Sequence, residues 1–412
     1  MSTSAPNHDP AIWDPVSRQS HEDPYPAYAR LREEFPLYYL EPHHAWALSR
    51  YADVRDALRD WETYSSAQGV ELGEYVQFFG EGSIQELDPP RHDVIRRVLA
   101  TRFASRNIKR YESMVRECAQ ELLRELPTSS SAGTWDIAAR FTQRLPIMTI
   151  FRLLGIPEQD ISWAMDAGLE MLNRPAGESG PSPAAIASRT ELVAYIHDQV
   201  LQRRAKADHG VACDDVLGDM AVGIASGQMR QQEVEGLTLL LIAAGMETTA
   251  SLMGNVVYAL AMQQVRPEAL LDDGGEFSMT AMDEFLRFDA PGQWLARVTT
   301  RPVTLHDQEL PTGSRVLVIF ASANRDHREF VRPDELVLDR DGSRNLSFGE
   351  GVHFCLGMPL ARLEARVGLT ELIAREPDLV IAGQCERYPS HVIRGYSSIP
   401  VRHGSARWGE PR

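Results

Sequence analysis

The stretch Phe348–Gly357 constrains this chain more than any other, and it reads Phe-Gly-Glu-Gly-Val-His-Phe-Cys-Leu-Gly. Glycines on both sides of Cys355 let the backbone fold tightly and bring amide N–H groups close to the sulfur. A helix-like run, Leu360 to Arg375, follows, and Pro359 is compatible with its first turn, where backbone N–H groups have no partner. These N–H groups and the positive end of the helix dipole favour thiolate over thiol, and the thiolate is the form that binds a metal.

The same stretch resembles the haem-binding loop of the cytochrome P-450 family. The family pattern is Phe-Gly-x-Gly-x-His/Arg-x-Cys-x-Gly, and the matching residues here are Phe348, Gly349, Gly351, His353, Cys355 and Gly357. An isolated cysteine in a glycine-rich turn is more often a small buried hydrophobe, so the flanking pattern decides for a ligand. The resemblance implies haem b, with Cys355 as the axial thiolate ligand of its iron.

The composition fits one large globular unit. The chain has 412 residues, a formal net charge of −16 and 43% hydrophobic residues, an acidic balance that argues against a nucleic-acid partner. Its four cysteines form no C-x-x-C pair, so neither a zinc site nor a disulfide framework is indicated. We expect a flexible segment over residues 1–22 and a single domain over residues 23–412. The resemblance implies a mainly α fold with a smaller β-rich lobe, a triangular prism around a buried haem.

Hydrophobic periodicity predicts the order of the elements. A hairpin is expected at Leu37–Leu40 and Ala45–Ser49. The run Gln231–Gln264 is apolar in its middle and predicts a buried central helix. The other expected helices are Asp23–Phe35, Tyr51–Tyr64, Arg91–Phe103, Asn107–Leu126, Ile137–Leu154 with a kink at Pro146, Gln159–Asn173, Ala184–Asp208, Asp214–Ala225 and Met279–Phe288.

The N-terminal segment Met1 to Pro15 is polar and lacks the apolar run of a signal peptide or membrane anchor. Together with the resemblance, this predicts the soluble bacterial type of the family. We therefore expect a cytoplasmic monomer that binds no membrane.

The predicted central helix contains Ala244-Gly245-Met246-Glu247-Thr248-Thr249, which resembles the oxygen-activation motif of the family. Unpaired polar groups in a buried helix are costly, and Thr248 could simply bond back to a carbonyl one turn earlier. The resemblance favours a catalytic pair instead: Thr248 would hold an ordered water, and Glu247 would feed protons from solvent as a general acid. Ala244 and Gly245 are small enough to let the helix pass close to the haem.

Charged residues supply the remaining family signatures. Glu284 and Arg287 form a Glu-x-x-Arg pair, common on solvated helices, which in this family is buried and tied to an arginine, here Arg340. Haem propionates need cations, and the bidentate fork of arginine suits them. The residues at the family's haem-contact positions are His92, Arg96, Arg297, His353, Ala244, Phe348 and Gly349.

The resemblance implies a monooxygenase that inserts one oxygen atom from O2 into a hydrophobic or aromatic small molecule by hydroxylation, epoxidation or dealkylation. An oxidative-coupling haem enzyme and a non-catalytic haem sensor remain alternatives. By family position the substrate pocket is lined by Leu240, Ala243, Ala244, Trp294, Leu295, Val392 and Ile393. Loops at Ser65–Asp88 and Met165–Pro183 are expected to close over it.

Because the motifs fill the chain, electrons from NAD(P)H are expected to arrive through separate proteins, a ferredoxin reductase and a small acidic ferredoxin. A basic docking face is expected on the Cys355 side of the haem. Its predicted members are Arg97, Arg102, Arg106, Lys109, Arg110, Arg362 and Arg366.

Overall fold

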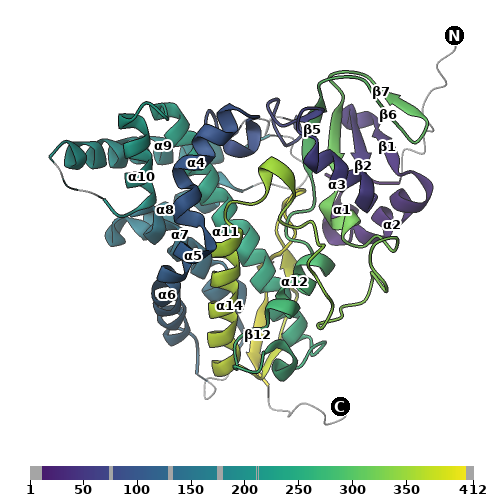
Figure 1. The fold of residues 1–412 in the computed structure, drawn as a ribbon. Coiled ribbons are helices and arrows are strands. Elements are labelled where there is room, and N and C mark those ends of the chain that lie inside the picture. The colour runs from purple at the N-terminus through teal and green to yellow at the C-terminus, as the bar shows by residue number, and fades with distance from the viewer. Residues whose placement is uncertain are drawn as a thin grey trace.

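The structure is a computed structural model, and it describes residues 12–73, 78–128, 133–173, 180–209, 211 and 213–404. Figure 1 shows a triangular outline, with the strands of the largest sheet on one side, most helices on the other, and β12 between them beside α14. The helices are α1 (Arg18–Glu22), α2 (Tyr25–Glu34), α3 (Tyr51–Arg59), α4 (Arg91–Phe103), α5 (Ser105–Ile108), α6 (Glu112–Arg124), α7 (Arg144–Leu154), α8 (Glu158–Met171), α9 (Pro183–Asp208), α10 (Val216–Ala225), α11 (Gln231–Ala261), α12 (Met279–Phe288), α13 (Phe320–Ala323) and α14 (Met358–Arg375).

The largest sheet has the order β1-β2-β8-β5-β3. The predicted hairpin is confirmed: β1 and β2 are antiparallel, with Leu37 opposite Leu48. β8 joins β2 in parallel and β5 in antiparallel register, which places Arg297 opposite Val316. The strands of the protein are β1 (Leu37–Leu40), β2 (Ala45–Leu48), β3 (Tyr64–Ser65), β4 (Trp135–Asp136), β5 (Leu295–Thr299), β6 (Val303–Leu305), β7 (Gln308–Leu310), β8 (Arg315–Val318), β9 (Leu379–Ile381), β10 (Glu386–Arg387), β11 (Tyr396–Ser398) and β12 (Pro400–His403).

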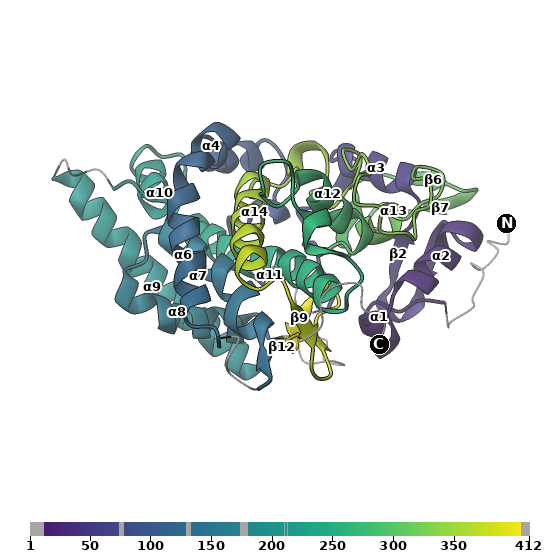
Figure 2. The ribbon, with the colours of Figure 1, turned by 90° about the horizontal axis from the view of Figure 1, so that it is seen from below.

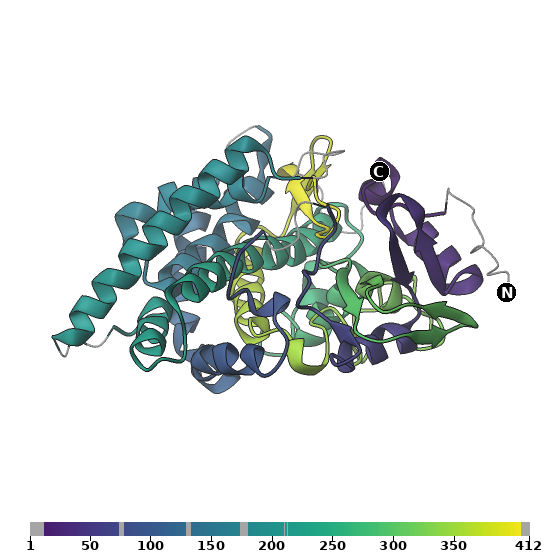
Figure 3. The same cartoon turned by 90° about the horizontal axis from the view of Figure 1, so that it is seen from above.

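Helix α11 runs through the middle of the molecule in Figures 2 and 3, and it packs against α7, α9 and α14. By length and composition it could cross a membrane, but 72% of its most apolar window is buried inside the protein. The predicted buried central helix is therefore confirmed. Two large apolar cores meet along it, one including Leu252 and Val256, the other including Leu237 and Ile242.

The structure differs from the predicted helices at three places. The run Tyr51–Tyr64 is helical only over α3, Tyr51–Arg59, and Tyr64 belongs to β3. The run Asn107–Leu126 is broken, because α5 ends at Ile108 and a short 3-10 turn, Lys109–Tyr111, precedes α6. The run Ile137–Leu154 is also divided: a π-helical turn, Ala138–Thr142, lies before α7, and Pro146 falls in the first turn of α7. A proline in a first turn disrupts nothing, because the N–H that it lacks would have no helical partner.

The N-terminal residues that the structure describes are packed. Ile12 and Trp13 are 6% and 5% exposed and join a core cluster with Tyr28. A flexible segment stays a prediction for residues 1–11, which lie outside the described part of the chain.

Candidate active site

The loop before α14 is shaped by two glycines. Gly349 and Gly351 have φ angles of 68° and 70°, a region that favours glycine. A Cβ on Gly351 would lie 2.7 Å from the carbonyl oxygen of Leu58, so this glycine also allows α3 to approach. The backbone N–H of Cys355 donates to the carbonyl of Phe348 at 2.9 Å and closes the loop.

The Cys355 sulfur lies in a site that suits a bound metal. Burial raises the pKa of the Cys355 thiol, while hydrogen bonds from the backbone N–H groups of Gly357 and Met358, and the charge of Arg96, oppose that rise. A metal ion at the sulfur would deprotonate it outright. Within the described residues no group of three or more His, Cys, Asp or Glu side chains could hold a metal, so a metal here would bring most of its ligands with it.

A cluster of basic side chains lies beside this loop. The rings of His92 and His353 are 4.7 Å apart, and Ser66 Oγ lies 3.2 Å from His353 Nε2. Burial, together with the charges of Arg297, His92 and Arg96, lowers the pKa of His353 to about 2. Burial also lowers the pKa of Arg297, which is 3% exposed, to about 10.

The basic cluster fits a ligand with carboxylates. His92 Nε2 is buried without a hydrogen-bond partner, and Arg297 Nη1 donates only to the adjacent Ala296 carbonyl, at 2.7 Å. A buried guanidinium and an unpaired buried imidazole nitrogen are costly unless an anion compensates them. The propionates of haem would supply such anions, so the residues present fit this group.

Arg96 connects the basic cluster to the cysteine loop. Its Nη2 donates at 2.6 Å to the carbonyl of Phe354, the residue before Cys355. Phe348 packs beneath the loop, where the guanidinium of Arg362 lies 5.5 Å from its ring centre.

In the middle of α11, Ala244 is exposed although its neighbours Ile242 and Ala243 are buried. An opening therefore lies against this turn of an otherwise covered helix. The hydroxyl of Thr248 donates to the Ala244 carbonyl at 2.7 Å, the back-bonded arrangement that the sequence left open. Gly245 lets α7 approach, since a Cβ there would lie 3.1 Å from Ile150.

Glu247 lines a cavity of about 270 Å³ between α8, α11 and the segment before β11. The same cavity is lined by the carboxylates of Asp166 and Glu170 and by Tyr388. Burial and the charge of Glu247 raise the pKa of Tyr388 well above its usual range. Glu247 thus lines a largely apolar cavity on the flank of α11, whose other walls include Ile147, Leu169 and Leu172.

The Glu-x-x-Arg pair is buried as the resemblance implied. Neither Glu284 nor Arg287 has exposed surface, and Arg340 Nε lies 3.0 Å from Glu284 Oε2. Arg287 also donates to the carbonyls of Asn324, Pro333 and Glu335 at 2.7–3.0 Å. This network fixes the chain that leads into the cysteine loop.

Comparisons with known proteins agree with this arrangement. A model of the cytochrome P450 family matches residues 6–154 and 277–375. The chain belongs to the cytochrome P450 family. A vitamin D(3) 25-hydroxylase from Pseudonocardia autotrophica is 33% identical over 398 residues, covering 93% of this chain and 94% of the relative. Cytochrome P450 130 from Mycobacterium tuberculosis is 32% identical over 393 residues, covering 92% of this chain and 94% of the relative.

Solved structures give the same result for the fold. The crystal structure of CYP109E1 from Bacillus megaterium in complex with testosterone has a TM-score of 0.81 and 26% identity, covering 94% of this chain and 99% of that one. This chain therefore has the P450 fold and is a haem monooxygenase. Its cofactor is a haem with an axial cysteine thiolate.

The predicted substrate-lining residues fall into two groups. Trp294 is fully buried, stacks on His391 with ring centres 5.6 Å apart, and packs with Val392. Leu295 and Ile393 are half-buried beside them. Leu240 and Ala243 belong to a different core cluster. The structure therefore brings residues together within each group but does not bring the two groups into one cluster.

The predicted basic docking face is only partly present. Arg102 is 7% exposed and donates to Tyr111 Oη at 2.7 Å and to Asp219 Oδ1 at 3.0 Å, so its placement on a docking face was wrong. It is buried because α10 covers this side of α4, where Asp219 on α10 and Asp214 just before it face Arg102. Arg362 pairs with Asp283, and Arg366 with Glu276, which weakens their contribution. Arg97, Arg106 and Lys109 are exposed.

Three residues at the site escaped the sequence analysis. Ser66 contacts His353, and Asp88 holds Ser66 through its backbone N–H at 3.0 Å. Glu364 on α14 is 2% exposed, and burial raises its pKa well above the usual range although Thr249 donates a hydrogen bond to it. The sequence could have singled out Glu364, because it is a carboxylate on the apolar face of the helix after Cys355.

Proposed function

We propose that this P450 inserts one oxygen atom from O2 into an apolar or aromatic small molecule, with Cys355 as the axial ligand of haem b. The observation that carries the proposal is the basic cluster beside the Cys355 loop, in which Arg297 is buried and His92 Nε2 has no hydrogen-bond partner among the described residues. Carboxylates of a haem would need cations and donors of this kind. When bound, the haem supplies O2 binding and electron-transfer chemistry that no side chain of the chain provides.

The chain's own residues bind and orient the group. Arg297 and His92 offer buried N–H donors to a propionate, Arg96 adds a second guanidinium, and His353, whose pKa is lowered to about 2, adds an uncharged imidazole. Ala244 is exposed on α11 and, with no side chain beyond Cβ, would leave room for the haem. The N–H groups of Gly357 and Met358 stabilise negative charge on the sulfur.

Proton delivery is the role that we assign to Thr248 and Glu247. The Thr248 hydroxyl reaches the opening at Ala244 and would hold an ordered water after leaving the Ala244 carbonyl. Glu247 lines the cavity of about 270 Å³ together with the carboxylates of Asp166 and Glu170, and as a general acid it would pass protons on from there.

Apolar side chains support an apolar substrate. We assign Trp294, Leu295, Val392 and Ile393 to one wall of the pocket, and Leu240 and Ala243 to another, next to the opening at Ala244. The relatives of this chain include a vitamin D(3) 25-hydroxylase and a P450 solved in complex with testosterone, which are consistent with a bulky apolar substrate. Pockets of this kind use few polar groups to fix orientation.

Electrons would come from NAD(P)H through a reductase and a ferredoxin in the cytoplasm, to a monomeric P450. The exposed residues Arg97, Arg106 and Lys109, together with Phe354, which is 39% exposed, offer a mixed basic and apolar surface near the cysteine loop. Such a surface suits a small acidic iron–sulfur protein.

The test combines spectroscopy with product analysis. The reduced CO complex of the wild type should show the red-shifted thiolate band, and Cys355→Ala should lose it. Incubation with NADPH, ferredoxin reductase, ferredoxin, 18O2 and a panel of steroids and aromatic compounds should give products carrying one 18O atom. Coupled products without 18O would favour the oxidative-coupling alternative, and a thiolate band without NADPH-dependent product from any panel member would favour a sensor.

A further inference from the structure

One carboxylate joins the two ends of the loop over residues 65–88. Asp88 Oδ1 accepts a hydrogen bond from the backbone N–H of Ser66 at 3.0 Å, and Asp88 Oδ2 accepts one from Ser65 Oγ. The carbonyl of Asp88 accepts from the backbone N–H of His92 at 3.0 Å, in the first turn of α4. Asp88 therefore fixes the base of this loop at the start of the helix that carries His92.

Ser66 lies where other parts of the basic cluster meet. The pairing of β3 with β5 ends one residue short of Ser66 on one strand and of Arg297 on the other. Ser66 has no exposed surface, and its Oγ lies 3.2 Å from Nε2 of His353. His353 also makes a hydrogen bond with the backbone of Ile84, near the other end of the loop. Both ends of the loop therefore contact the imidazole that comes from the cysteine loop.

The basic cluster needs such a scaffold because its members do not attract one another. The buried guanidinium of Arg297 and the rings of His92 and His353 come from three separate segments of the chain, and the two rings are 4.7 Å apart. Each buried basic group raises the cost of charging the next one. The charge of Asp88 opposes the fall that burial causes in the pKa of Arg297, so this carboxylate also offsets the positive charge of the cluster.

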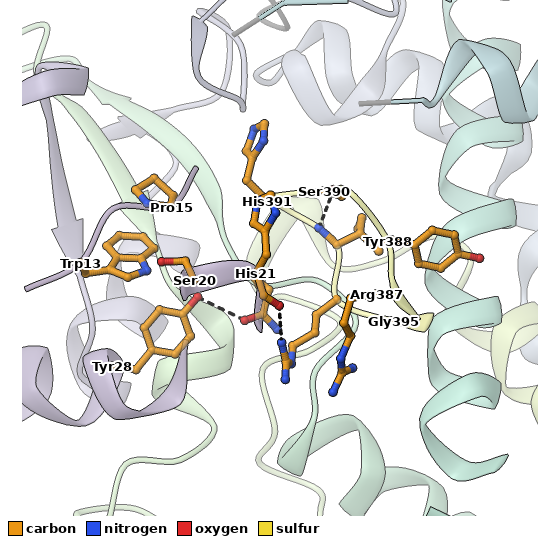
Figure 4. A pocket seen from close by; sticks show the side chains of 13 residues that line it. Trp13, Pro15, Ser20, His21, Tyr28, Arg387, Tyr388, Ser390, His391 and Gly395 are labelled. Atoms are coloured by element: carbon orange, nitrogen blue, oxygen red, sulfur yellow. Dashed lines mark hydrogen bonds between the residues drawn. The ribbon is translucent and has the colours of Figure 1, made fainter. Parts of the chain in front are cut away.

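A small pocket between the two ends of the described chain lacks this arrangement (Figure 4). Trp13 Nε1 and His21 Nε2 are buried there without hydrogen-bond partners. Its two arginines share one carboxylate, because Arg394 Nε donates to Asp289 Oδ1 at 2.8 Å and Arg387 Nη1 lies 3.6 Å from Asp289 Oδ2. The enclosed volume of about 10 Å³ is the space of one water molecule. The charges of this pocket are therefore balanced without a further ligand.

We propose that Ser66 and Asp88 are positioning residues for the haem: Ser66 fixes the orientation of the His353 imidazole that a propionate would meet, and Asp88 holds Ser66 in place. The inference rests on the proposed function, because it concerns the haem that Cys355 would bind. It assigns to the base of the loop a role in retaining the cofactor, distinct from covering the substrate.

The test measures how fast the haem-loaded protein loses haem to an excess of apomyoglobin, and it records the propionate bending band by resonance Raman spectroscopy. Ser66→Ala should lose haem about 5-fold faster, as for loss of one neutral hydrogen bond, and should shift the propionate band. In the His353→Phe background, Ser66→Ala should change the rate of haem loss by less than about 2-fold, because its partner is already gone. A purely structural effect of Ser66 would persist in that background.

Two variants of Asp88 separate its geometry from its charge. Asp88→Ala removes both and should lose haem about 3- to 5-fold faster. Asp88→Asn should stay within about 2-fold of the wild type, because an amide can still accept from the Ser66 N–H and donate to Ser65 Oγ. Haem loss as fast in Asp88→Asn as in Asp88→Ala would overturn the positioning role of Asp88. If Ser66→Ala fails to fold, this pair of variants carries the test.

Matched controls are Ser322→Ala and Asp60→Ala, which remove comparable hydrogen bonds outside the basic cluster. Ser322 is fully buried, and its Oγ donates to the Ser49 carbonyl at 2.8 Å. Asp60 Oδ1 accepts from the backbone N–H of Thr63 at 3.1 Å. Both variants should leave the rate of haem loss and the propionate band unchanged. Acceleration by either control equal to that of Ser66→Ala would overturn the proposal.

The two proposals fail in different ways. Without the thiolate band of the reduced CO complex, the proposed function is wrong. With the band present, haem loss from Ser66→Ala at the wild-type rate, or an effect of Ser66→Ala that is undiminished in the His353→Phe background, makes only the positioning proposal wrong.

Discussion

Glu284 and Arg287 form a doubly hydrogen-bonded ion pair in which neither side chain is exposed. Arg287 Nε donates to Glu284 Oε2 at 2.7 Å, and Nη2 donates to Oε1 at 2.8 Å. The backbone N–H of Val337 also donates to Glu284 Oε1, at 2.8 Å. Both charges depend on this geometry, because water reaches neither of them.

Glu284→Gln should therefore destabilise the protein strongly, by about 3 kcal/mol or more, because it leaves Arg287 charged and buried without its anion. The matched control is Glu335→Gln, whose carboxylate pairs with Arg332 on the surface and should cost less than about 1 kcal/mol. Urea unfolding of the two variants measures the difference. Equal losses would contradict a special role for the buried pair.

A second prediction concerns Thr248. Thr248→Ala should retain haem and ligand binding but release hydrogen peroxide, since the hydroxyl that would hold the proton-delivering water is gone. Product formed per NADPH consumed should fall severalfold. The measurement is parallel quantification of NADPH, product and peroxide.

Thr238→Ala is the control for this experiment. Thr238 lies on the same helix and also bonds back to a carbonyl one turn earlier, that of Val234, at 2.7 Å. It tests whether loss of a back-bond in α11 is sufficient to uncouple the reaction. A fall in product per NADPH in both variants would show that the helix, not Thr248, is responsible.

Local patterns in the sequence predicted the elements that carry the site. The bounds of α4 and α12 agree with the predicted helices, because each has a clear apolar stripe and a proline or serine just before its start. The Phe348–Gly357 pattern likewise predicted a glycine-shaped loop, which the φ angles of Gly349 and Gly351 confirm.

Contacts between distant segments could not be read from the sequence. Arg102 has the pattern of a surface arginine, and only the packing of α10 on α4 shows that it is buried against Asp219. Trp13 and Arg387 lie at opposite ends of the chain, and no periodicity relates them. The partner of Ser66, His353, is 287 residues away, so only the fold reveals that contact.

A third prediction is the acid sensitivity of Glu233 at the start of α11. Burial raises the pKa of Glu233, but hydrogen bonds from Arg91 and Arg230 outweigh it and lower the pKa to about 2. A carboxylate with a lowered folded-state pKa adds stability above its ordinary value of 4.5, and that stability is lost as the pH falls toward 2. Between these values the wild type should lose stability steeply.

The measurement is the free energy of unfolding in urea at several pH values from 7 to 3. Glu233→Gln should be less stable than the wild type at pH 7, and the two curves should converge as the pH falls. Glu268→Gln, at an exposed position, is the control and should follow the wild type throughout. Curves for Glu233→Gln and the wild type that stay parallel would show that this carboxylate does not contribute.

The last prediction concerns the electron-donor surface. Arg97 and Lys109 are exposed, on α4 and on the turn before α6, and Phe354 exposes apolar surface beside the cysteine loop. Because the whole chain carries a formal net charge of −16, an acidic ferredoxin would be repelled except at a locally basic face.

The double variant Arg97→Glu/Lys109→Glu should therefore reduce the rate of ferredoxin-supported turnover about 10-fold at low salt. This loss should shrink as salt rises, because exposed charges are screened. Dithionite reduction of the haem should be unchanged, and Arg402→Glu, another exposed arginine, should have little effect. An unchanged ferredoxin titration would place the electron-donor surface elsewhere on the protein.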